Sequence, residues 1–75
     1  MKTVFIACYK GTETDDILGV FSNLENAQKA IGKDYENTEF GYTADYAEIG
    51  DSYIFIQKKG EWYDEWYIVE TELQD

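Results

Sequence analysis

Carboxylates interleaved with aromatic rings are the side chains whose types and spacing could do chemistry in this sequence. Two carboxylates can hydrolyse glycosides when their surroundings raise the pKa of one of them, which then acts as the acid. With sixteen acidic residues in a chain of 75, however, such pairs arise by chance. A chain of this length also buries only about 60% of its unfolded surface, which leaves little room for an enclosed active site. The sequence therefore predicts a protein that is not an enzyme.

Other catalytic and cofactor chemistries lack the residues that they need. Histidine is absent, which removes the usual general base near neutral pH and the commonest transition-metal ligand. One cysteine, Cys8, cannot form a zinc site, and no glycine-rich phosphate-binding motif occurs. A calcium loop starting at Asp34 would place Glu39 where an EF-hand has glycine. We expect no metal and no cofactor.

Net charge is −10, and its distribution along the chain is uneven. Residues 1–33 carry four bases and four acids, whereas residues 34–75 carry Lys58 and Lys59 against twelve acids. Such a field repels nucleic acid and anionic membranes and attracts basic protein surfaces over about 8 Å at physiological salt. The alternative interpretation is that the acidity serves only solubility.

The acidic second half suggests mimicry of nucleic acid. Residues two apart on a strand lie about 6.6–6.8 Å apart on one face, which is comparable with the spacing of phosphates along a strand. Rows of carboxylates could thus occupy a groove lined by Lys and Arg, with tyrosine and tryptophan as rigid anchors. The predicted partner contacts are Asp45, Glu48, Asp51, Glu61, Asp64 and Glu65, with Trp62 and Tyr63 as anchors.

The aromatic residues also have a purely structural interpretation, in which they cover a thin core. For Trp66, Tyr67 and Tyr53 this interpretation is preferred. Tyr42 and Tyr46, like the two anchors, are expected at the surface.

The first half of the chain predicts a hairpin followed by a helix. Thr3–Lys10 is a continuous apolar run typical of a strand covered on both faces, and Ile17–Phe21 returns antiparallel to it after a polar loop. Ser22-x-x-Glu25 is a capping box, which predicts a helix from Asn23 of about nine residues. We expect Gly32 to end the helix, and its buried stripe to consist of Leu24, Ala27 and Ile31.

The second half predicts two further strands after an irregular acidic segment. In that segment, 40–43 is expected to form a short strand and 44–49 a helical turn. Ser52–Lys58 is a strand, and the last strand follows a turn at Lys59-Gly60. In that last strand we expect one face to be the core, formed by Tyr67, Val69, Thr71 and Leu73.

The predicted fold is α+β: an antiparallel sheet of about four strands with one short helix packed on one face, in the order β-β-α-β-β. We expect a single domain over residues 1–75, in which residues 33–65 form an acidic, tyrosine- and tryptophan-rich elaboration. The longest apolar run, Val4–Tyr9, is too short to span a membrane, so a cytoplasmic protein with a buried, reduced Cys8 is expected.

Two stretches resemble a small uncharacterised family of bacterial and phage proteins. In that family a two-strand opening runs into a GVFSS-x-E-x-A helix start, which GVFSNLENAQKAI (Gly19–Ile31) resembles, and a late strand is similar to WYIVETELQ (Trp66–Gln74). The resemblance covers Val4–Ile31 and Trp66–Gln74, and it implies a fold without implying an activity. In size, acidity and lack of catalytic residues the chain is also similar to small phage-encoded anti-defence proteins, such as anti-CRISPR and anti-restriction proteins.

The sequence thus favours a non-enzymatic inhibitor that blocks the basic surface of a nucleic-acid-binding host defence protein. In that reading the chain binds neither nucleic acid nor membrane, and if phage-encoded it acts in the host cytoplasm. The alternative is a structural or homo-oligomerising module whose sheet edge pairs with a second copy. A sensor that binds a small ligand through its tyrosines is a third possibility.

Overall fold

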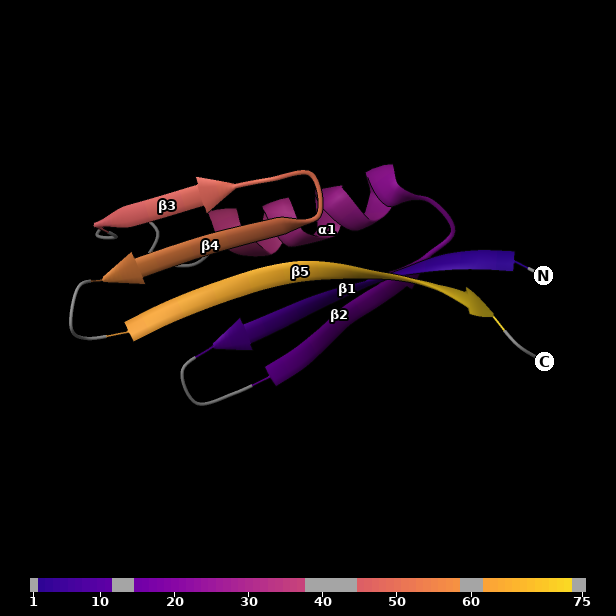
Figure 1. The fold of residues 1–75 in the computed structure, drawn as a ribbon, viewed down its shortest axis with the longest axis horizontal. Coiled ribbons are helices and arrows are strands. Elements are labelled where there is room, and N and C mark those ends of the chain that lie inside the picture. The colour runs from indigo at the N-terminus through magenta and orange to yellow at the C-terminus, as the bar shows by residue number, and fades with distance from the viewer. Residues whose placement is uncertain (1, 12–14, 38–44, 59–61, 74–75) are drawn as a thin grey trace.

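A computed structural model describes residues 2–11, 15–37, 45–58 and 62–73 (Figure 1). Five strands and one helix lie in these ranges. They are β1 (Lys2–Gly11), β2 (Asp15–Phe21), α1 (Leu24–Glu36), β3 (Tyr46–Ile49), β4 (Tyr53–Lys58) and β5 (Trp62–Leu73).

The strands form one antiparallel sheet in the order β2-β1-β5-β4-β3, and α1 runs roughly along them on one side (Figure 1). The helix contacts β1, β2, β4 and β5. The Cα atoms extend 43 × 21 × 17 Å, and the shortest extent fits a sheet and one helix layer. The α+β class is confirmed, and the described residues include one helix, as predicted.

The strand count corrects the prediction, because the order is β-β-α-β-β-β. Tyr46–Ile49, expected as part of a helical turn, is a strand that pairs with β4 from Ile54 to Gln57. Four residues are too few to show a period of two by themselves, so this strand is set by its partner. The short strand expected at 40–43 lies outside the described residues.

The hairpin of β1 and β2 is confirmed, and β1 lies between β2 and β5. Its continuous apolar character follows from this position, because Ala7 is buried on the helix side and Cys8 on the other. An irregularity in the pairing between Ala7 and Cys8 leaves Leu18 as the extra residue of β2, and Leu18 packs against the core.

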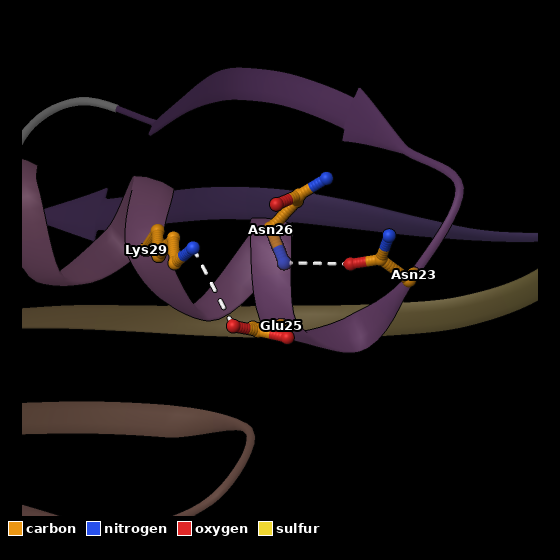
Figure 2. A network of polar contacts seen from close by, with 4 residues as sticks. All are labelled: Asn23, Glu25, Asn26 and Lys29. Carbon is orange, nitrogen blue, oxygen red and sulfur yellow. Dashed lines mark hydrogen bonds and ion pairs between the residues drawn. The ribbon is translucent and has the colours of Figure 1, made fainter.

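The helix starts one residue later and ends four residues later than predicted. Asn23, and not Ser22, is the N-cap, and its side chain accepts a hydrogen bond of 2.8 Å from the Asn26 amide (Figure 2). Asn caps a helix as well as Ser does, so the capping-box pattern alone did not decide between the two. The Glu25 side chain reaches forward instead, to Lys29 at 3.4 Å (Figure 2).

Gly32 lies inside α1, whose end is capped by the Asn37 amide donating to the Lys33 and Asp34 carbonyls at 3.1 and 3.2 Å. Docking on the sheet stabilises the last turn and outweighs the low helix propensity of glycine. Ala27 and Ile31 are buried as predicted, and Leu24 is half-buried.

The core lies between α1 and the face of the sheet that includes Trp66, which is 1% exposed. The expected core face of β5 is therefore wrong: Val69 and Leu73 are 41% and 48% exposed on the opposite side. Glu70 and Glu72 share the side of Trp66 and misled the pattern. They pair with Phe5 and Thr3 near the start of β1, where they are exposed. Buried core residues are Ala7, Ala27, Ile31, Ile54, Ile56 and Trp66.

Within the described ranges, no helix combines the length and the apolar character needed to cross a membrane.

Candidate binding surface

The side of the sheet that faces away from α1, here called the open face, carries an unusual set of side chains. Strand alternation and the register assign residues to it, because directly paired residues point to the same side. Starting from the pairs Cys8–Tyr67 and Tyr53–Tyr67, every second residue along β1, β3, β4 and β5 lies on this side. On β2 the extra residue interrupts the alternation, so Val20 and Ile17 are assigned through their partners Ile6 and Cys8. The open face includes Ile6, Cys8, Ile17, Val20, Tyr46, Glu48, Tyr53, Phe55, Tyr63, Glu65, Tyr67 and Val69.

One half of the open face lies over β3, β4 and the beginning of β5 and combines rings with carboxylates. Phe55 lies between two tyrosines, with ring centroids 6.1 Å from Tyr46 and 6.3 Å from Tyr63. The second pair is stacked, with an interplanar angle of 23°. We call this half the acidic–aromatic surface and define it by Tyr46, Glu48, Tyr53, Phe55, Tyr63 and Glu65.

Two carboxylates flank the central ring of this surface. Glu48 pairs with Phe55 on one side and Glu65 pairs with it on the other, so the three residues form one row across three strands. Neighbouring strands lie about 4.7–4.9 Å apart, which puts the backbones of the two glutamates about 9–10 Å apart. Glu48 is exposed and Glu65 is half-buried. The row presents negative charge on both sides of an apolar ring.

Tyr53 shows that this negative charge is felt locally. The pKa of its hydroxyl is raised, first because partial burial disfavours the phenolate and second because of the charge on Glu48. The Tyr67 hydroxyl also has a raised pKa, caused mainly by its contact with Cys8 and then by desolvation. Both tyrosines therefore stay neutral hydrogen-bonding groups at physiological pH.

The structure brings together three of the eight predicted contact residues, namely Glu48, Tyr63 and Glu65. Asp45 lies next to them, at the entry to β3, where its amide donates to the Gln57 carbonyl at 2.9 Å. Asp51 lies at the opposite end of β4, in the turn from β3. Its carbonyl accepts from the Gln28 side chain at 2.8 Å, and its own side chain is exposed.

Asp64, another predicted contact residue, lies on the other face of the sheet and is buried. It is 8% exposed, and its carboxylate accepts a hydrogen bond of 2.5 Å from the Tyr9 hydroxyl. Strand alternation explains the difference, because Tyr63 and Glu65 point to the open face and Asp64 between them does not. Trp62 begins β5, but its side chain and the whole of Glu61 lie outside the described residues.

Asp64 belongs to a polar and aromatic cluster that attaches the end of α1 to the sheet. The Trp66 indole nitrogen donates to the Asp34 carboxylate at 2.7 Å, and the Trp66 ring lies 5.4 Å from Tyr9 and 5.6 Å from Tyr35. Burial raises the pKa of the Tyr9 hydroxyl, and its hydrogen bond to Asp64 raises it further. No buried side-chain nitrogen or oxygen among the described residues lacks a hydrogen-bond partner, so the cluster has a structural role.

Phe55 was not among the predicted contact residues, and Tyr53 and Tyr46 were not among the predicted anchors. Alternate residues of Tyr53–Lys58 face opposite sides of the sheet: Ile54 and Ile56 face the core, and the rings of Tyr53 and Phe55 face outward. Both sets are apolar, so composition alone does not tell the covered side from the open one.

The other half of the open face lies over β2, β1 and the end of β5 and is apolar. Val20, Ile6 and Val69 form one row across these strands, and Ile17 follows in the next row. Ile17, Val20 and Val69 are 72%, 60% and 41% exposed. We call these four residues the aliphatic surface.

Sites for small ligands are poorly supported in the described part of the chain. No group of three or more side chains that could bind a metal ion comes together among the described residues. A wide-open depression of about 270 Å³ lies between α1 and β2, lined by Leu18, Ala30, Lys33, Asp34 and Asn37. Its mixed lining gives no specific chemistry.

No protein-family model matches the chain, and neither the curated proteins nor the solved structures include a significant match to it.

Proposed function

We propose that this chain is a non-enzymatic binding protein whose acidic–aromatic surface occupies the basic, nucleic-acid-binding surface of a host defence protein. The observation that supports the proposal best is the row of Glu48, Phe55 and Glu65 on a face that α1 does not cover. Carboxylates beside partly exposed rings on a sheet match the chemistry of a surface built to hold phosphates and bases.

Arginine is the partner side chain that this surface fits best. A guanidinium group can stack on a ring while its N–H groups form paired hydrogen bonds with a carboxylate. Phe55 supplies the central ring, and Glu48 and Glu65 supply acceptors on both sides of it. A lysine ammonium would gain the charge attraction but not the planar stacking. The proposed partner surface is therefore rich in arginine.

Long-range electrostatics supports the same partner class. Net charge is −10, and within residues 34–75 only Lys58 and Lys59 oppose twelve acids. This field steers the chain toward positive surfaces and away from nucleic acid and anionic membranes. Binding should therefore weaken as salt rises, and the chain should compete with nucleic acid for the partner.

The similarity in type to small acidic phage anti-defence proteins supports the choice of a defence protein as the partner. With this partner, the interaction would take place in the bacterial cytoplasm, and the targets would be nuclease complexes that bind nucleic acid. Inhibition there requires only that the chain be bound, which agrees with the absence of histidine and of phosphate-binding motifs.

A matched pair of double variants tests the proposal. Glu48→Gln with Glu65→Gln removes two charges from the acidic–aromatic surface, and Glu70→Gln with Glu72→Gln removes two from the far end of β5. Each variant and the parent are used to capture proteins from lysates of bacteria that carry defence systems, at low and at high salt. Captured proteins are then tested for displacement from duplex DNA and from RNA.

We expect the parent and the Glu70/Glu72 variant to capture the same nucleic-acid-binding protein, to lose it at high salt, and to displace nucleic acid from it. The Glu48/Glu65 variant should bind it at least about tenfold more weakly. Equal loss of binding in both double variants would mean that net charge alone acts. Capture of no nucleic-acid-binding protein would overturn the proposed function.

A further inference from the structure

The aliphatic surface needs an explanation that the proposed function does not provide. Its four members are branched aliphatic residues on three adjacent strands, three of them are exposed and Ile6 is half-buried, and α1 packs on the opposite side of those strands. A contiguous apolar patch of this kind on a small chain usually marks an interaction site. The aliphatic surface would add little to the binding of a basic partner, because arginine and lysine side chains gain little from aliphatic neighbours without carboxylates.

We propose that the aliphatic surface binds a second copy of this chain, so that two sheets stack face to face in a symmetric dimer. A two-fold dimer uses the same patch on both copies, which a flat patch of Ile and Val satisfies without any further complementarity. The covered residues would be Ile6, Ile17, Val20 and Val69, with sheets about 10 Å apart as in other face-to-face packings.

Charges at the two ends of the patch favour one orientation of the dimer. At one end Lys10 lies between Glu65 and Asp15, a group with one net negative charge, and at the other end Lys2 pairs with the apolar Leu73. A two-fold axis that crosses the strands near Ile6 makes each strand antiparallel to its copy. Lys2 of each copy then lies over Lys10 of the other, with the Glu65 and Asp15 carboxylates on either side. The charges of Lys2 and of this group sum to zero.

A two-fold axis in the plane between the two sheets could instead run along the strands. That orientation of the dimer is disfavoured. It would place Glu65 of one copy over Asp15 of the other, because β5 and β2 flank β1 and would exchange positions. Like charges that face each other at close range are destabilising. Both axes place lysines of β1 over one another, so the carboxylates decide between them and favour the antiparallel stack.

This arrangement leaves the β3 and β4 part of each acidic–aromatic surface uncovered, whereas Glu65 on β5 lies at the dimer contact. These two strands extend beside only the first part of β5, from Trp62 to Tyr67. After the two-fold rotation, β3 and β4 of the second copy lie beside the end of the first copy's β5, next to which the first copy has no β3 or β4 of its own. The dimer would thus present the β3 and β4 part of one acidic–aromatic surface at each end, and it could bind two basic sites at once.

The size of the patch sets the strength of the contact. Three strands at about 4.8 Å and about six residues at 3.4 Å cover roughly 15 by 20 Å, well below the approximately 800 Å² per partner of standard interfaces. The dimer should therefore be reversible, with a dissociation constant in the micromolar range or weaker, and not a permanent one.

Sedimentation equilibrium of the full chain, from micromolar to millimolar concentration, tests the inference. The parent should pass from the 8.7 kDa monomer toward twice that mass. Val69→Glu should raise the dissociation constant at least about tenfold, because two buried charges enter each dimer. Ile49→Glu is the matched control: Ile49 is 65% exposed on β3, outside the aliphatic surface, and should leave the dimer unchanged.

Val69 also separates the stacked dimer from pairing along a sheet edge, because β5 is the middle strand. Val20→Glu provides a second disruption at a site that is 60% exposed, in case Val69→Glu impairs folding, which circular dichroism would reveal. A parent that stays monomeric at millimolar concentration would overturn the inference. So would a dimer that survives both substitutions, which would point to edge pairing. Either result leaves the proposed binding of a basic partner intact, since that experiment uses different residues.

Discussion

The two faces of this sheet use similar residues for opposite purposes. On the side of α1, large side chains pack under the helix and their polar atoms form hydrogen bonds, as Trp66 does with Asp34 and Tyr9 with Asp64. On the open face, comparable rings and aliphatic side chains meet solvent, with Val20 60% exposed. The difference teaches that a small chain can devote one face to stability and leave the other for contact.

The largest expected effect comes from placing a charge on each face in turn. Ile31→Asp should destabilise the fold by at least about 3–5 kcal/mol, because Ile31 is 2% exposed and the new carboxylate would be buried without a partner. Val20→Asp should leave the thermal unfolding midpoint of the monomer almost unchanged. A cooperative unfolding transition at the parent temperature in Ile31→Asp would refute the assignment of the core.

A smaller difference in stability is expected between two variants that each lose one tyrosine hydroxyl, one on each face of the sheet. Tyr9→Phe removes the donor to the buried Asp64 carboxylate and should cost about 1–3 kcal/mol. Tyr46→Phe, at a ring that is 50% exposed, should change the free energy of unfolding by less than about 0.5 kcal/mol. Urea titrations of both variants measure the contrast, and equal costs would show that Tyr9 gains nothing from Asp64.

Alkaline pH should destabilise the fold through Tyr9, which lies on the face of the sheet that α1 covers. Because burial and Asp64 raise the pKa of Tyr9 in the folded chain, the folded state holds this proton more tightly than the unfolded state does. The stabilisation is fully present below the ordinary value of 10.0 and declines as the pH rises above it. In Tyr9→Phe this decline should be smaller, as seen in denaturation curves at increasing pH. An identical decline in both proteins would assign it to other groups.

The smallest expected effect on stability comes from a substitution in α1, the helix that packs on the core face of the sheet. Gly32 lies inside α1, and nothing lies within 4 Å of the position of an added Cβ. Gly32→Ala should therefore stabilise the fold by about 0.5–1 kcal/mol, through lower entropy of the unfolded chain. Calorimetry should show a higher unfolding temperature. A lower temperature would mean that α1 does not continue through this residue.

The sequence predicts the elements of this fold better than it predicts their faces. The hairpin and the strand at Tyr53–Lys58 follow from local pattern, and so does a helix that buries Ala27 and Ile31. The side of β5 that packs against α1 does not, because Tyr67 and Val69 look as apolar as Trp66 and Ile68. Only the position of the helix distinguishes them, and that is a tertiary fact.

The candidate surface was predictable to a similar degree. Among the predicted contact residues, Glu48, Tyr63 and Glu65 lie together, although Glu48 was expected in a helical turn and lies on a strand. Asp64 was misplaced because it was counted with its neighbours, although neighbours on a strand face opposite sides. Phe55 was missed because its contacts with Tyr46 and Tyr63 join three strands, and no local pattern encodes that pairing.

The most direct test of the central claim is a titration of the isotope-labelled chain with a short arginine-rich peptide, followed by amide chemical shifts and compared with a lysine-rich peptide of equal charge. The account predicts shift changes concentrated at Tyr46, Glu48, Phe55, Tyr63 and Glu65, with tighter binding of the arginine peptide. Changes spread over all acidic positions, including Glu25, Glu70 and Glu72, with equal affinity for both peptides, would contradict it.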